Sequence, residues 1–136
     1  MWVRTAMLRV KATIAPSEIA GIGLFAAEPI AAGTVIWRLD PGVDQVFTAE
    51  QISGLPRLAE LLDRHGWFNS EDGFWYLSAD EMRFMNHSPS PNTVETNRFT
   101  VVAAVDIGSG EELTCDYRQT CGHFAAAPPN WAQGAL

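Results

Sequence analysis

Hydrophobic residues recur along this chain in short runs that are separated by turn-forming residues. Runs rich in β-branched and aromatic residues, or alternating between apolar and polar positions, are typical of strands. The runs that predict strands here are residues 3–14, 24–27, 34–39 and 99–107. Glycine turns at 21–23 and 31–33 separate the first three of them. Residues 67–68 and 74–77 flank a polar turn and predict a hairpin.

One segment, residues 48–65, follows a helical pattern instead, with apolar residues at helical spacing in its second half. Thr48 and Gln51 have the form of a capping box at its start. Pro56 is suited to the first turn of a helix, and Gly66 is a suitable stop. The chain therefore predicts a mainly-β domain with a short helical insert.

The chain has 136 residues, enough for one domain with a real core. The pattern of short strands does not by itself distinguish a barrel from a sandwich. Nothing in the sequence determines the oligomeric state, and a homodimer is left open.

The charge distribution argues against binding of nucleic acid. Nine basic residues are scattered among sixteen acidic ones, for a net charge of −7, whereas phosphate binding needs clustered Lys and Arg. An acidic surface suits a basic, lysine-containing protein or peptide as partner. The alternative is that the negative charge only aids solubility.

The cysteines and the N-terminus bear on metal binding and location. The two cysteines, Cys115 and Cys121, fit no zinc-ligand spacing and form no disulfide framework, so we expect no zinc and a reducing compartment. The sequence shows no signal-peptide core and no apolar run of about 18 residues that could span a membrane. We expect a cytoplasmic protein.

Three motifs stand in order along the chain. GIGLFA occupies residues 21–26, RFMNHSPSPN occupies 83–92, and GEELTCDY occupies 110–117. Together they resemble the SET-domain methyltransferases. The resemblance covers about residues 9–118 and implies a β-clip fold of small curved sheets with a C-terminal pseudoknot. It places the SET domain in residues 1–121 and leaves 122–136 as an irregular tail that could act as a lid.

The resemblance also implies the chemistry, which is methyl transfer from S-adenosylmethionine with S-adenosylhomocysteine as product. Tyr117 would be the catalytic residue beside the methyl group and the amine, although a buried strand tyrosine is the alternative. Asn86 and His87 would bind the cofactor rather than transfer protons or ligate a metal. The full set of expected cofactor-binding residues is Ala20, Gly21, Ile22, Gly23, Asn86, His87, Tyr117 and Trp131.

The glycines of the first motif would let the backbone approach the methionine part of the cofactor. Pro91 and Asn92 would fix the crossing of the two C-terminal motifs. Glu112, Asp116 and Arg83 are expected to be structural.

The acceptor is expected to be a lysine side chain in a channel with aromatic walls, for which the candidates are Tyr76, Trp37 and Phe124. The match departs from the family at two points. Pro89 stands where many relatives have a zinc-binding cysteine, and Leu39 and Trp37 stand near a tyrosine that lines the amine pocket in relatives. The alternatives are therefore a non-catalytic peptide-binding subunit with the same fold, or methylation of an amine other than lysine.

Overall fold

The computed structural model describes residues 7–40, 42–69, 72–97 and 100–117. Its strands are β1 (Met7–Leu8), β2 (Ala12–Pro16), β3 (Ile22–Ala26), β4 (Val35–Arg38), β5 (Gln45–Phe47), β6 (Trp67–Asn69), β7 (Phe74–Leu77), β8 (Asn86–His87), β9 (Thr93–Asn97), β10 (Thr100–Ala103) and β11 (Thr114–Cys115). Its helices are α1 (Ala49–Ser53), α2 (Pro56–His65) and the 3-10 helix η1 (Glu81–Phe84). The described residues confirm a mainly-β fold with small sheets and few helices.

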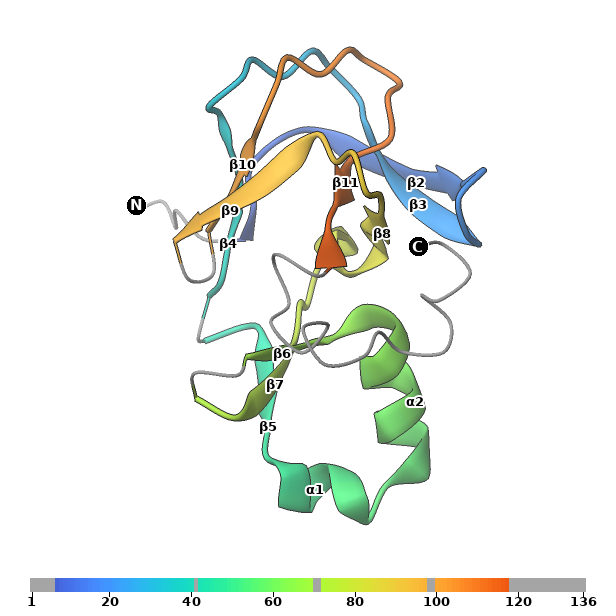
Figure 1. Ribbon diagram of the computed structural model, residues 1–136, viewed down its shortest axis with the longest axis vertical. Coiled ribbons are helices and arrows are strands. Elements are labelled where there is room, and N and C mark those ends of the chain that lie inside the picture. The colour runs from blue at the N-terminus through green and yellow to red at the C-terminus, as the bar shows by residue number, and fades with distance from the viewer. Residues whose placement is uncertain (1–6, 41, 70–71, 98–99, 118–136) are drawn as a thin grey trace.

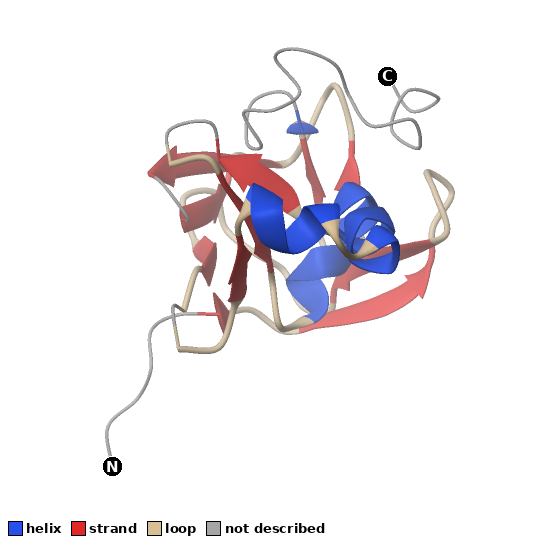
Figure 2. Ribbon diagram, turned by 90° about the horizontal axis from the view of Figure 1, so that it is seen from below, coloured by secondary structure: helices blue, strands red, loops and turns tan. Residues whose placement is uncertain are grey.

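The strands form several small sheets rather than one large sheet. Among the described residues the strand orders are β1-β4-β10-β9, β2-β3, β5-β7-β6 and the parallel pair β11-β8. In Figure 1 the first two sheets lie at one end of the molecule, the insert of α1, α2 and β5–β7 lies at the other, and β8 and β11 lie between them. Figure 2 looks along the molecule from the side of the insert, with its helices in front.

The main core lies among the small sheets at the first end. Leu24 of β3, Ile36 of β4 and Leu113 before β11 are fully buried in it. Backbone bonds join these segments, because the N–H of Leu113 donates to the carbonyl of Leu24 at 2.8 Å. The residues just before β11 are thereby fixed against β3, although they are far apart in the sequence.

The insert follows the predicted signals with one difference. Thr48 and Gln51 form the predicted capping box, with each side chain bonded to the other residue's N–H at 3.2 and 2.7 Å. The segment is two helices rather than one, because Pro56 begins α2 instead of continuing α1. The predicted hairpin is confirmed as β6–β7, and β5 adds a third strand that was not predicted.

The predicted strand over residues 3–14 is wrong in its described part. β1 pairs with β4 and β2 pairs with β3, so the chain leaves one sheet and enters another between them.

The predicted strand at 99–107 is longer than the observed one: β10 ends at Ala103, and Ile107 makes only an isolated bridge to Ile30. The strand predicted at 24–27 begins earlier, at Ile22, so only the first part of 21–23 is a turn. β9 was not predicted, because the asparagine and proline of the motif before it read as a loop.

The second and third motifs lie side by side through the parallel pairing of β8 with β11, in which Asn86 faces Thr114 and His87 faces Cys115. Asn92 fixes this arrangement with its side chain. Its Nδ2 donates to the carbonyl of Glu112 at 2.8 Å, and its Oδ1 accepts from the N–H of Thr114 at 2.9 Å. One asparagine amide therefore binds the backbone on both sides of Leu113.

Replacing Asn92 with Ala should destabilise the fold by about 2–3 kcal/mol, because it leaves two partly buried backbone groups without partners. Chemical denaturation followed by tryptophan fluorescence measures this change. Ser88→Ala is the matched control, since that side chain makes one exposed bond to the N–H of Ser90, and its effect should stay within about 0.5 kcal/mol. An Asn92→Ala variant as stable as the control would contradict the role assigned to this side chain.

Candidate functional site

Two cavities meet in the region where the motifs converge. The larger, of about 480 Å³, is lined by Ala20, Gly21, Ile22, Arg64, His65, Arg83, Phe84, Met85, Asn86 and Tyr117. The smaller, of about 80 Å³, is lined by Trp37, Arg64, His65, Gly66, Trp67, Ser78, Met82, Arg83, Met85, Glu95, Val101, Cys115 and Tyr117. The residues common to both are Arg64, His65, Arg83, Met85 and Tyr117. Tyr117 and the other shared residues therefore lie at the boundary between two adjacent cavities.

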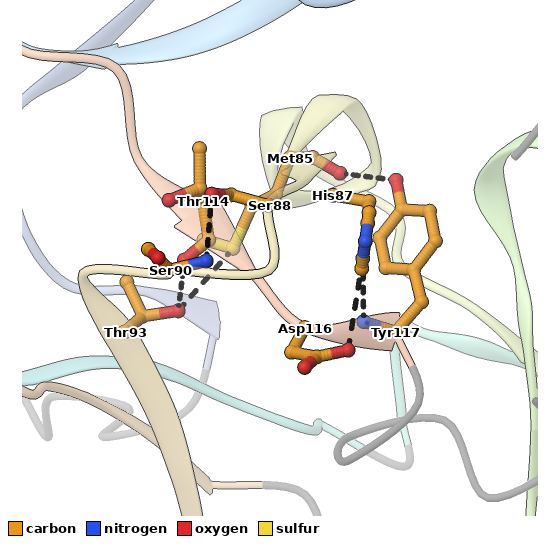
Figure 3. Close-up of polar contacts among 8 residues, drawn as sticks. All are labelled: Met85, His87, Ser88, Ser90, Thr93, Thr114, Asp116 and Tyr117. Carbon is orange, nitrogen blue, oxygen red and sulfur yellow. Dashed lines mark hydrogen bonds and ion pairs between the residues drawn. The ribbon is translucent and has the colours of Figure 1, made fainter. Parts of the chain in front are cut away.

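Tyr117 is held at this junction from both ends. Its hydroxyl donates to the backbone carbonyl of Met85 at 2.7 Å, and its backbone N–H donates to Nδ1 of His87 at 3.1 Å (Figure 3). Both rings are buried, with 8% of Tyr117 and 2% of His87 exposed. His87 lines neither cavity, and its contact with the N–H of Tyr117 positions the backbone of Tyr117.

Asn86 lies on the wall of the larger cavity with its amide group among oxygen atoms. Its Nδ2 is 2.9 Å from Oε2 of Glu112, 3.1 Å from Oγ of Ser17, 3.1 Å from the carbonyl of Ala20 and 3.4 Å from that of Ile22. Because all four neighbours are acceptors, the amide can only be oriented with its nitrogen toward them. The amide has two hydrogens, so these oxygens keep acceptor capacity for a further donor.

The two glycines of the first motif have different roles. Gly21 adopts φ +45°, which only glycine adopts without strain, and it lines the larger cavity. Gly23 has no such backbone and does not line the cavity. A Cβ at Gly23 would lie 2.5 Å from Oε2 of Glu112, so this glycine leaves room for a carboxylate. The sequence predicts that both glycines let the backbone approach the cofactor; of the two, Gly21 lines the larger cavity and Gly23 does not.

The smaller cavity has an apolar aromatic wall. Trp37 is 2% exposed and meets Trp67 edge to face, with ring centroids 5.5 Å apart. Tyr76, expected to line the channel, lies behind Trp67 and stacks on it at 5.4 Å, and its hydroxyl donates to Asp72. Trp67 is the wall residue that sequence reasoning missed. The aromatic pairing of the predicted hairpin was the available signal, but it did not show which ring faces the cavity.

Basic groups from the insert and η1 line both cavities. The guanidinium of Arg83 donates from Nε to the carbonyl of Ser78 at 3.0 Å, and Arg64 is exposed at the end of α2. His65 donates from Nδ1 to the carbonyl of Arg83 at 3.1 Å. Burial lowers the pKa of His65 and outweighs the bond to the carbonyl of Arg83, which raises it; the charges of Arg83 and Arg64 add to the lowering, so the neutral ring is favoured at neutral pH. The sequence predicted a short helical insert at Arg64 and His65 and assigned neither residue to the site, and Arg83 was expected to be structural.

Some expected residues lie outside the described part of the chain. Trp131 and Phe124 are among them, as are Cys121 and His123. Within residues 7–40, 42–69, 72–97 and 100–117, no group of three or more His, Cys, Asp or Glu side chains could hold a metal ion. In the same ranges no helix has the length and apolar character needed to cross a membrane.

Solved structures show the same fold. A chain described as a candidate histone methyltransferase of Plasmodium falciparum matches with a TM-score of 0.59 and 23% identity, over 81% of this chain and 95% of that one. A chain of the apo ctPRC2 complex with a mutated Ezh2 matches with a TM-score of 0.65 and 21% identity, over 82% of this chain but only 15% of that one. No match was found among curated proteins.

The family model described as the SET domain matches residues 21–118, which include the turn at Gly21, the crossing motifs and Tyr117. This match covers well over half of the chain, and the small sheets agree with it. The chain therefore belongs to the SET-domain family, whose methyltransferases use S-adenosylmethionine.

Proposed function

We propose that this protein is an S-adenosylmethionine-dependent protein-lysine N-methyltransferase. The observation that carries the proposal is the meeting of two separate cavities at Tyr117. A transfer between two substrates that enter separately requires such a junction, because the donor and the acceptor must be held in line. The cofactor supplies an activated methyl group on a sulfonium, and the residues described above do the positioning.

The larger cavity fits the donor in size and in chemistry. Its volume of about 480 Å³ lies in the range of small-molecule sites. The carbonyls of Ala20 and Ile22 face the amide of Asn86 with acceptor capacity to spare, which suits the α-ammonium group of the cofactor. Arg64 and Arg83, which also line this cavity, suit its carboxylate.

The smaller cavity fits an amine on an alkyl chain. Its apolar wall of Trp37, Trp67 and Met82 would strip water from an entering lysine and lower its pKa toward the neutral, nucleophilic form. The ring faces can also hold the amine while it is still charged. The hydroxyl of Tyr117 donates to Met85 and retains lone pairs, which can accept a C–H···O contact from the methyl group at the junction.

The acidic composition of the chain favours a basic substrate. With a net charge of −7 it should attract lysine-rich peptides and repel acidic ones. The substrate class is therefore a lysine-containing segment of a basic protein.

Replacing Tyr117 with Phe should lower methyl transfer at least about 100-fold while leaving the affinity for S-adenosylhomocysteine within a few-fold, because the hydroxyl positions the reacting groups. Transfer of radiolabelled methyl to basic proteins, with mass spectrometry of the product, measures the first effect. Calorimetry measures the second.

The same assay separates the rival functions. Cofactor binding with no transfer to any protein would favour a non-catalytic peptide-binding subunit. Radiolabelled methyl groups found on an amine other than a lysine side chain would show that the protein methylates a different acceptor. A wild-type protein that binds neither the cofactor nor its product would refute the proposal.

Acidification should weaken the binding of S-adenosylmethionine through His65. Protonation below its lowered pKa adds a positive charge beside Arg64 and Arg83 in the cavity proposed for a cationic ligand. Between about pH 7.5 and about pH 5.5 the loss of affinity should be larger for S-adenosylmethionine than for its uncharged-sulfur product. Besides His65 and the two arginines, the ionisable residues that line the two cavities are Glu95, Cys115 and Tyr117.

His65→Asn is the matched variant, since its amide keeps a donor near the carbonyl of Arg83 without a titrating ring. Its affinity should depend less on pH. Its stability should also fall less on acidification, because a folded-state pKa below the unfolded value removes stability as the pH falls through about 6.5. An identical pH dependence in the two proteins would exclude His65 as the cause.

Removing residues 122–136 should leave a folded protein with much weaker cofactor binding and little turnover. The segment begins a few residues after Tyr117, which lines both cavities, and it carries the large apolar residues Phe124 and Trp131. Circular dichroism and calorimetry of the truncated chain measure fold and binding. Unchanged kinetics would show that the segment is dispensable.

A further inference from the structure

Glu112 lies behind the wall of the larger cavity and makes an unusual set of contacts. It was expected from the sequence to be merely structural. Both oxygens of its carboxylate lie within reach of the hydroxyl of Ser17, at 2.8 and 2.9 Å, and Oε2 accepts from Nδ2 of Asn86 at 2.9 Å. Glu112 does not itself line the cavity.

The two donors to this carboxylate belong to different parts of the cavity wall. Asn86 comes from β8, whereas Ser17 begins the loop that carries Ala20 and leads into Ile22, the first residue of β3. The hydroxyl of Ser17 also accepts from the N–H groups of Ile19 at 2.9 Å and Ala20 at 3.4 Å. The carboxylate therefore connects the amide on one strand with the loop that presents the carbonyls.

The backbone of Glu112 is fixed independently of these contacts. It forms a bridge with Phe25 of β3, and the residue before it accepts from the N–H of Ala26 at 2.9 Å. The carboxylate thus extends from an anchored position to two parts of the wall, Asn86 and the Ser17 hydroxyl, and Gly23 is the residue whose missing Cβ leaves space for it.

The charge of Glu112 is not neutralised by a cation within the described ranges, where its partners are the neutral Ser17 and Asn86. Partial burial of a carboxylate without an ion pair costs folding free energy. A negative charge at this place becomes favourable when a cationic ligand occupies the adjacent cavity. It also accepts from the amide of Asn86, which leaves the acceptor capacity of the neighbouring carbonyls for that ligand.

We propose that Glu112 is a positioning residue for the methyl donor: it acts through Asn86 and Ser17 to hold the carbonyls of Ala20 and Ile22 toward the ammonium group of the donor, and Gly23 is required because it accommodates the Glu112 carboxylate. This inference rests on the proposed function. According to this inference, Gly23 of the first motif is needed to leave room for the carboxylate of Glu112 in the third motif, and not to leave room for the ligand.

The test compares the affinity for S-adenosylhomocysteine of the wild type with that of Glu112→Gln, Gly23→Ala and the double variant. Glu112→Gln keeps the size of the side chain but removes the charge, so the dissociation constant should rise about tenfold. Gly23→Ala should have a similar or larger effect, because its methyl group displaces the carboxylate. Both changes disrupt the same contacts of the Glu112 carboxylate, so their effects on affinity should not add. The double variant should bind S-adenosylhomocysteine no more weakly than the single variant with the lower affinity.

Glu111→Gln is the matched control, because it removes the same charge from the neighbouring, exposed residue. Its dissociation constant should stay within about twofold of the wild type. The KM values give a second readout. Glu112→Gln should raise the KM for the donor and leave the KM for the acceptor peptide unchanged, a split that a general loss of stability would not produce.

The outcomes are distinguishable. If Glu112→Gln lowers the melting temperature but binds as the wild type does, the residue is only structural and the inference is wrong. Additive effects of the two single variants would refute the link between Gly23 and Glu112. A wild type that binds no S-adenosylhomocysteine would instead refute the proposed function, and this inference with it.

Discussion

The parallel contact between β8 and β11 is the constraint on which the rest of the site depends. It places Asn86 and His87 beside the residues just before Tyr117, and the side chain of Asn92 secures it through two bonds to the backbone on either side of Leu113. Without this contact the residues that line the two cavities would come from unconnected parts of the chain. The site therefore depends on a short strand pair reinforced by the side chain of Asn92, among the small sheets that the described residues form.

This arrangement separates the tasks of neighbouring residues. Asn86 faces the larger cavity, whereas His87 turns inward and accepts from the backbone of Tyr117. Charge is divided in a similar way. Acceptor oxygens gather around Asn86, and the basic residues Arg64 and Arg83 line the same cavity. A ligand that carries both an ammonium and a carboxylate matches this division, which supports the assignment of the larger cavity to the donor.

The sequence predicted the parts of the structure that local patterns determine. The capping box at Thr48, the β6–β7 hairpin and the family fold are of this kind. It did not predict that residues 3–14 would divide between two sheets, because strand partners far away in the sequence leave no local signal. The same reason explains why Trp67 was missed as a wall residue: its face is chosen by Trp37 from another sheet. Gly23 shows the limit most clearly, since the side chain that occupies the space beside it is that of Glu112, which is far away in the sequence.

The central claim is that donor and acceptor meet at Tyr117, and a crystal structure of the full chain with S-adenosylhomocysteine tests it most directly. The account predicts the nucleoside in the larger cavity, with its ammonium group on the carbonyls of Ala20 and Ile22 and its sulfur directed toward the opening to the smaller cavity. A nucleoside bound elsewhere, or one with its sulfur directed away from Tyr117, would contradict the account.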